Sequence, residues 1–212
     1  GAKWDWLGGR LSTTAALFRT EKHDVPHKTR LSDTVFYEEQ IVQGLELGIA
    51  GNITEKLKAF GGLLWIDSER KNSAAFNAEA CDDRNGDYGV GSDAECAGVT
   101  TNGDELAFTP RFSATLWLTY DVTDKFTFGG GVQYVGESWL GRPDDAFRVI
   151  KNGVYDKLPD YFLVNLMASY DITDNVELQF NVDNVFDEDY AVSTNWPGTR
   201  ATLGAPRTYR IG

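Results

Sequence analysis

The chain has 212 residues, and its 20 Lys and Arg against 32 Asp and Glu give a formal charge of -12 at pH 7. This acidic balance disfavours nucleic acid as a partner, because a phosphate backbone requires a basic surface. No segment approaches the roughly 20 consecutive apolar residues of a membrane-spanning helix, which excludes a helical membrane protein.

Alternation of apolar and polar residues is the clearest pattern in the chain. It predicts β-strands, because successive side chains of a strand point to opposite faces. Weak copies occur at residues 11–17 and 45–49, and regular copies at 112–122, 126–134, 162–172 and 176–182. In the last segment one face is wholly apolar, and the other consists of Glu177, Gln179, Asn181 and Asp183.

The connections between these segments alternate between short and long. A tight turn of similar composition occurs three times, at residues 53–57, 122–126 and 172–176, and Gly8-Gly9 forms a fourth. The other connections are long and polar, at about 22–34, 71–106, 141–157 and 188–205. In a meander this places all short turns at one rim, which predicts an all-β fold, an antiparallel up-and-down transmembrane β-barrel.

The pattern yields about nine strands. Outer-membrane chains have even strand numbers and close on themselves, because an open edge in lipid leaves backbone groups unpaired. We therefore expect residues 1–212 to be one part of a barrel that is incomplete at both ends. On the apolar faces, Tyr120, Phe126 and Tyr170 lie next to the short turns, where an interfacial aromatic girdle is expected, although aromatic residues also suit strands in general.

A soluble lipocalin-like barrel with its apolar face inward would alternate in the same way. Two features favour the membrane interpretation: the length of every second connection, and the mixed charges of the polar face, which suit a hydrated lumen.

Two cysteines, Cys81 and Cys96, lie in one polar stretch and predict a local disulfide in an oxidising compartment, the alternative being two free thiols. Between them, Asp83, Asn85 and Asp87 resemble half of a calcium loop, but the later bidentate Glu is missing, so a solvated acidic loop is the competing interpretation. His23 and His27, the only histidines, are expected in a loop because Pro26 argues against a helix. No catalytic motif is present, and the sequence predicts no enzyme.

The most specific motif spans residues 178–190, Leu-Gln-Phe-Asn-Val-Asp-Asn-Val-Phe-Asp-Glu-Asp-Tyr. It resembles the penultimate strand of TonB-dependent outer-membrane siderophore receptors. Residues 195–198 and 204–212 are similar to the last loop and final strand of that family, and residues 11–22 are similar to a mid-barrel strand of its catecholate branch. The aromatic C-terminal residue typical of such proteins is absent.

The resemblance implies the C-terminal nine strands of a 22-stranded barrel in the outer membrane of a Gram-negative bacterium, surrounded by lipid, with an N-terminal plug that this chain does not contain. It implies import of a ferric siderophore, energised by the TonB complex through the absent N-terminal region. Iron would be cargo, and no covalent cofactor is expected. The alternatives are a soluble ligand-binding barrel and a non-transporting outer-membrane barrel.

A ferric catecholate is anionic and aromatic, so its site should combine basic and aromatic side chains. On the predicted long-loop rim such residues are Trp139, Arg142, Arg148, Tyr155, Trp196 and Arg200. Tryptophan at the membrane interface and solvated arginine would account for the same residues without a ligand.

Overall fold

The structure, a computed structural model, describes residues 1–27, 35–72, 105–139, 157–194 and 200–212. Its elements are β1 (Ala2–Trp6), the 3-10 turn η1 (Leu7–Gly9), β2 (Leu11–His27), β3 (Phe36–Asn52), β4 (Leu57–Asn72), β5 (Phe112–Asp121), β6 (Phe126–Val135), β7 (Ser138–Trp139), β8 (Lys157–Leu158), β9 (Tyr161–Thr173), β10 (Val176–Asp183), β11 (Ala191–Thr194), β12 (Ala201–Leu203) and β13 (Thr208–Ile211). Within these ranges, no helix is long and apolar enough to cross a membrane.

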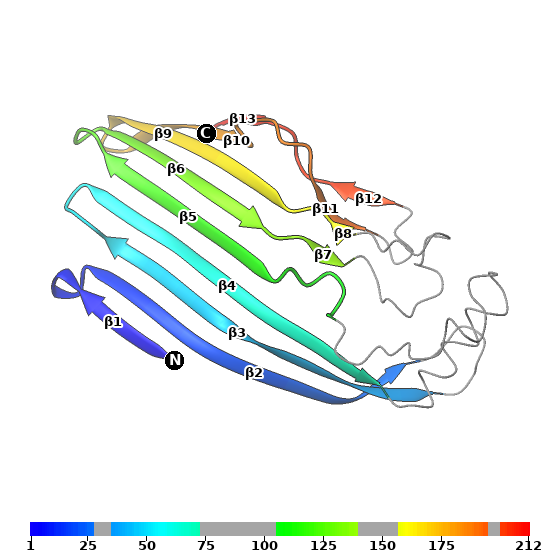
Figure 1. The fold of residues 1–212 in the computed structure, drawn as a ribbon. Coiled ribbons are helices and arrows are strands. Elements are labelled where there is room, and N and C mark those ends of the chain that lie inside the picture. The colour runs from blue at the N-terminus through cyan, green and yellow to red at the C-terminus, as the bar shows by residue number, and fades with distance from the viewer. Residues whose placement is uncertain (28–34, 73–104, 140–156, 195–199) are drawn as a thin grey trace.

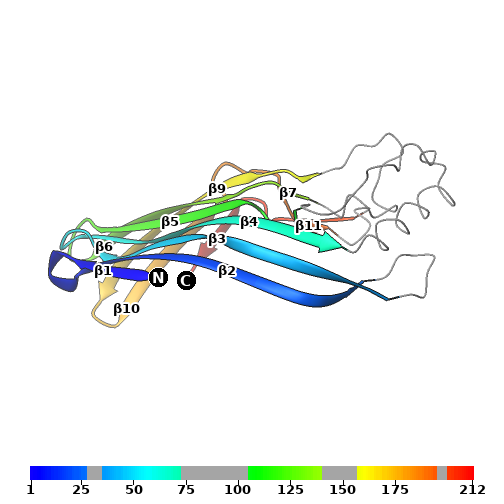
Figure 2. The ribbon, with the colours of Figure 1, turned by 60° about the horizontal axis from the view of Figure 1, so that its bottom comes forward.

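Nine strands form one antiparallel sheet in the order β1-β2-β3-β4-β5-β6-β9-β10-β13. The sheet is a single curved layer with its short turns at one end (Figures 1 and 2). Two small sheets complete the fold: β7-β8 flanks the long connection after β6, and β11-β12 lies within the connection between β10 and β13. The predicted all-β antiparallel meander of about nine strands is therefore confirmed, and the connection at residues 188–205 contains a short hairpin that the sequence did not predict.

A threonine closes each of the three similar turns. The Thr54 hydroxyl accepts hydrogen bonds from the backbone N–H groups of Lys56 (3.2 Å) and Leu57 (2.9 Å). Thr123 repeats this with the two residues at the same spacing, and Thr173 with Asn175 at 3.3 Å. These bonds satisfy turn N–H groups that have no ladder partner, which explains the recurrent composition of the turns.

The strands β2, β3 and β4 are longer than the sequence predicted, with 17, 17 and 16 residues. The expectation that His23 and His27 lie in a loop is wrong, because β2 continues to His27. The ladder with β3 passes an irregularity between Lys22 and Val25 and ends with His27 opposite Phe36. Pro26 is tolerated because the described part of the sheet gives this end of β2 a partner on one side only.

The register assigns every strand residue to one of two faces. Directly opposed residues share a face, so Leu47, Leu63, Ala114, Tyr134 and Phe162 form one row across five strands. We call this side the apolar face. The row beside it, on the polar face, contains Glu46, Leu64, Ser113, Val135 and Tyr161.

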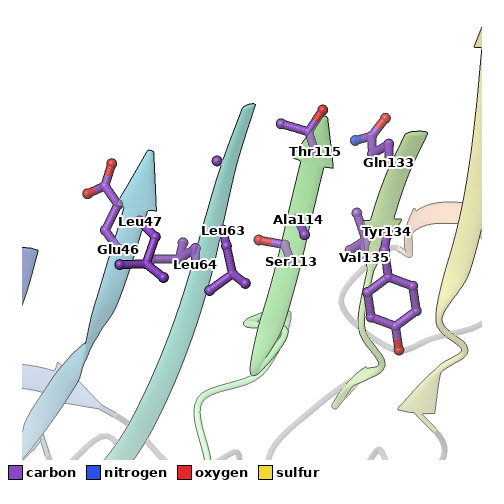
Figure 3. A pocket seen from close by; sticks show the side chains of 11 residues that line it. Glu46, Leu47, Leu63, Leu64, Ser113, Ala114, Thr115, Gln133, Tyr134 and Val135 are labelled. Atoms are coloured by element: carbon purple, nitrogen blue, oxygen red, sulfur yellow. The ribbon is translucent and has the colours of Figure 1, made fainter. Parts of the chain in front are cut away.

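Figure 3 shows the two sides from close by: Glu46, Thr115 and Gln133 point one way, and the Tyr134 ring points the other way. The predicted apolar residues of 112–120, 126–134, 162–170 and 178–182 that have ladder partners fall on the apolar face, whereas Val176 lies at a register irregularity opposite Thr173.

No second layer covers the apolar face within the part of the chain that the structure describes. Val176 is 51% exposed, Leu178 48% and Phe180 39%, and buried apolar side chains are confined to Ile41, Ala59 and Leu163. A soluble barrel that enclosed its apolar face would bury Val176, Leu178 and Phe180. The exposure of such large side chains is instead what a lipid-facing surface requires.

Candidate functional site

Two aromatic belts cross the apolar face. Near the short turns, Tyr120 is opposite Phe128, and Phe126 is opposite Tyr170. This places the three predicted girdle residues in one belt.

The sequence analysis missed the second belt, which lies toward the other end of the strands. There Trp65 is opposite Phe112, Tyr134 is opposite Phe162, and the Phe112 and Tyr134 rings are 5.8 Å apart. The belts are eight positions apart along β5, from Phe112 to Tyr120, which is about 26 Å of strand. At the usual tilt this spans about 20 Å of membrane normal, comparable to the roughly 25 Å apolar band of outer-membrane barrels.

A polar network begins directly beyond the second belt on the same face. Arg19 donates to Gln43 (3.0 Å), Gln43 donates to Asp67 (3.1 Å), and Arg111 lies 3.8 Å from Asp67. The Arg19 guanidinium also donates to the Glu21 carboxylate, at 2.7 Å, and holds the pKa of Glu21 below its usual value. These charged groups lie beyond the membrane-crossing part of the strands, because lipid tails would not solvate them.

The polar face carries ion pairs near both ends of the sheet: Lys58 lies 3.1 Å from Asp121, and Arg210 lies 2.7 Å from Asp183. Glu46 differs from these residues. No cation lies within ion-pair distance of it among the described residues, and its cross-strand neighbours are Ala16 and Leu64.

Glu46 lies at the edge of a hollow of about 350 Å³ over Gly62, and other polar groups around this hollow come from Ser113, Thr115 and Gln133 (Figure 3). Among the described residues, the carboxyl group of Glu46 in the middle of the polar face thus has no ion-pair partner.

The strands β7 and β8 form a separate two-stranded sheet, and after two unpaired residues on each strand it keeps the register of β6 and β9. Val135 is opposite Tyr161, and four residues further along each strand Trp139 is opposite Lys157. Because four is an even number, Trp139 and Lys157 share the polar face with Val135 and Tyr161. Pro159, which has no N–H to donate, lies in the two-residue interruption between β8 and β9.

At this rim the Lys157 ammonium lies over the Trp139 ring, 4.5 Å from its centroid, and forms an ion pair with Glu137. The backbone N–H of Phe108 donates to the Trp139 carbonyl at 2.8 Å. The Tyr161 and Tyr190 rings are 4.5 Å apart, so a second aromatic pair lies near the rim, four residues from Lys157 along the chain. Aromatic faces and a cation thus occur together on the polar face of the rim.

The family-like motif contains a closed turn at Asn184. This residue is 3% exposed, and its backbone φ of 52° is in the left-handed region. Its side chain donates to the carbonyls of Glu188 (2.9 Å) and Ala205 (3.1 Å) and accepts from the Glu188 N–H (2.8 Å). Asn184 therefore ties the end of β10 to the segment leading into β13, a structural role.

Two of the six predicted ligand residues are described. Trp139 lies in β7, and Arg200 is an exposed residue directly before β12. The other four, Arg142, Arg148, Tyr155 and Trp196, lie outside the described residues, as do Cys81, Cys96, Asp83, Asn85 and Asp87. Within the described ranges no group of three metal-binding side chains occurs.

Sequence reasoning missed Lys157, Tyr161 and Tyr190. Their placement depends on the register between strands, for which the sequence offers no local pattern.

Residues 1–185 match the family model described as TonB dependent receptor-like, beta-barrel. The chain is 32% identical over 214 residues to the catecholate siderophore receptor Fiu of Escherichia coli K12, covering all of this chain and 24% of that protein. It is 32% identical over 193 residues to the probable TonB-dependent siderophore receptor PiuA of Acinetobacter baumannii, covering 90% of this chain and 22% of that protein.

The crystal structures of the same two receptors align with the fold. The PiuA structure gives a TM-score of 0.74 at 29% identity, and the closed form of Fiu gives 0.73 at 28% identity. Each alignment covers 99% of this chain and 26% of the other chain. The chain thus spans about a quarter of the length of these relatives.

Proposed function

Because this chain belongs to the TonB-dependent receptor β-barrel family, we propose that it is the C-terminal barrel portion of a receptor that imports a ferric siderophore, of the catecholate type, across the outer membrane of a Gram-negative bacterium. The observation that carries this proposal is the match of the whole chain to about a quarter of the catecholate siderophore receptor Fiu. Residues 1–212 would supply nine of the receptor's strands, incomplete at both ends, and the rest of the longer protein would supply the remaining barrel and the plug.

The two faces of the sheet support this function. The apolar face, limited by its two aromatic belts, suits contact with lipid, and the network from Arg19 to Arg111 suits the aqueous side of the membrane boundary. The polar face, with its ion pairs and Glu46, suits a lumen that holds water and a plug.

Ligand capture belongs to the rim opposite the short turns. There we place the predicted residues Trp139, Arg142, Arg148, Tyr155, Trp196 and Arg200. Aromatic rings and guanidinium groups match the rings and the negative charge of a ferric catecholate. Iron is the cargo and the TonB complex the energy source, acting through the absent N-terminal region. Calcium binding at Asp83, Asn85 and Asp87 is not part of the proposal.

The loop between Cys81 and Cys96 is proposed to be closed by a disulfide, which suits an exported protein. Alkylation of the denatured, unreduced receptor followed by mass analysis tests this directly. Full alkylation of both thiols without a reductant would show that the bridge is absent.

The function is tested by uptake in cells. A strain that lacks its other siderophore receptors, and carries the intact gene, should accumulate iron from a ferric catecholate only while the TonB complex is energised. Loss of uptake on deleting the energy-transducing protein is the expected control. Binding without any uptake would favour a non-transporting outer-membrane barrel, and a detergent-free soluble protein would favour the lipocalin-like alternative.

A further inference from the structure

A three-residue cluster at the rim combines opposite charges with an aromatic ring. Lys157 lies over Trp139 and is paired with Glu137, so one ammonium group is shared between a π-face and a carboxylate. Neither Lys157 nor Glu137 belongs to the ligand residues predicted from the sequence.

We propose that Lys157, held over Trp139, binds the anionic oxygens of the ferric catecholate, and that Glu137 is a counterion which the ligand displaces. This inference rests on the proposed function and deepens it, because it names the pair that selects ligands by charge.

The cluster of Glu137, Trp139 and Lys157 faces the side from which a ligand would arrive. The offset that places Val135 opposite Tyr161 is kept where Trp139 is opposite Lys157, beyond two unpaired residues on each strand, which assigns the cluster to the polar face. That face lines the lumen under the proposed function. A ligand that enters from the rim with the long connections therefore contacts these side chains, whereas lipid does not reach them.

Preorganisation is the second argument. Trp139 and Lys157 are direct cross-strand neighbours, and the Phe108 N–H fixes the Trp139 carbonyl from a third segment. The ammonium is thus already positioned over the ring before a ligand arrives. A lysine that is held in place loses less side-chain entropy on binding than a free one.

Exposure is the third argument. The Glu137 side chain is 60% exposed and that of Lys157 33%. An exposed ion pair is weakly stabilising, so an incoming anion can replace the carboxylate at small cost. Lys157 keeps its contact with the Trp139 ring when the carboxylate is replaced. A neutral ligand has no charge to pair with Lys157 and therefore gains no affinity from this exchange.

The ion pair of Lys58 and Asp121 provides a matched control. It lies on the same face at the opposite rim, with 3.1 Å between Lys58 Nζ and Asp121 Oδ2. Asp121 also accepts a hydrogen bond from the Thr127 hydroxyl at 3.0 Å, which anchors the carboxylate.

The test is equilibrium binding to the intact receptor, purified in detergent, of two ferric complexes: a synthetic tris-catecholate, which is anionic, and a trihydroxamate, which is neutral. Lys157→Gln should raise the Kd for the catecholate complex about three- to tenfold, and Lys157→Arg should restore it. Glu137→Gln should lower the same Kd about twofold, because the competing carboxylate is gone. Lys58→Gln and Asp121→Asn should leave it unchanged.

The opposite signs of the two substitutions separate ligand binding from a purely structural ion pair. If Lys157→Gln and Glu137→Gln both weaken binding, or neither changes it, the inference is overturned while the proposed function stands. An equal loss for the neutral hydroxamate complex also overturns it. If the wild-type receptor binds no ferric catecholate, the proposed function fails and the inference with it.

Discussion

The indole ring of Trp117 lies across the backbone of Gly131, its direct neighbour on the adjacent strand, where a methyl group would overlap the ring. The indole N–H donates to the Thr119 hydroxyl at 3.1 Å, which holds the ring along the sheet. Gly131 thus allows the Trp117 ring to lie flat against the polar face of the sheet, where a larger residue would force the ring to project into the lumen side.

Gly131→Ala should destabilise the intact receptor by about 1–3 kcal/mol, because the ring must leave its position. The measurement is the urea midpoint of unfolding in detergent micelles. Gly62→Ala is the control, since a Cβ there meets only the Leu47 carbonyl at 3.4 Å. Equal midpoints for the two variants would contradict this packing.

Leu116 and Thr115 are neighbours that point to opposite faces of β5, and Leu116 lies midway between Phe112 and Tyr120 of the two belts. Leu116→Lys should cost about 2–4 kcal/mol of stability in a bilayer, because the charge enters the lipid core. Thr115→Lys should be tolerated. The fraction of intact receptor that becomes protease-resistant in lipid vesicles measures the difference. The reverse order of the two variants would invert the assignment of the faces.

Asn184 should be intolerant of substitution for two separable reasons. Asn184→Gly removes the three side-chain hydrogen bonds to Glu188 and Ala205, which leaves buried groups unpaired at about 1–3 kcal/mol each before relaxation. Asn184→Ala loses the same bonds and adds the strain of a positive φ, about 1 kcal/mol more. Thermal unfolding should therefore rank wild type above the glycine variant and glycine above alanine. An alanine variant as stable as the glycine variant would show that the backbone relaxes there.

The short turn at Thr123 should depend on its hydroxyl group. Thr123→Ala should destabilise the receptor by about 1 kcal/mol, because the N–H groups of Lys125 and Phe126 lose their acceptor. Thr123→Ser retains the oxygen and serves as the control. Hydrogen exchange of the two amides gives the local readout, and unchanged exchange in the alanine variant would argue against the role of the hydroxyl.

Glu46 should be neutralised in the intact receptor by a cation from the domain that fills the lumen. Glu46→Gln should therefore lower the urea concentration at which a reporter cysteine in that domain becomes reactive. Glu177→Gln, on the same face near the short-turn rim, should have no such effect. Identical urea profiles for all three proteins would mean that no cation pairs with Glu46.

The strands and short turns could be predicted because their signals are local. Within residues 176–182 the polarity of each residue indicates the face on which it lies, and the threonine of each short turn forms hydrogen bonds within that turn. The extended ends of β2 to β4 could not be predicted in this way, because apolar and polar residues do not alternate there. His23 is placed by its contact with Glu39 on the next strand, 3.1 Å from Nδ1 to Oε1, and no local pattern indicates that contact.

The candidate site was predicted only in part for the same reason. Trp139 could be identified by its type and its place at the start of a long connection. Lys157 becomes a candidate only because it is opposite Trp139, and Tyr190 only because its ring contacts that of Tyr161. Such pairings depend on which residues a connection brings together, which composition does not encode.

The β7-β8 pair keeps the register of β6 and β9 across two unpaired residues on each strand, so the side on which Trp139 lies depends on the number of residues between Val135 and Trp139. Removing a single residue between Val135 and Trp139 would move the indole to the apolar face. Removing two residues would shorten the strand and keep the indole on the polar face. Insertions and deletions between Val135 and Trp139 should therefore occur in steps of two residues, or as matched changes on both strands.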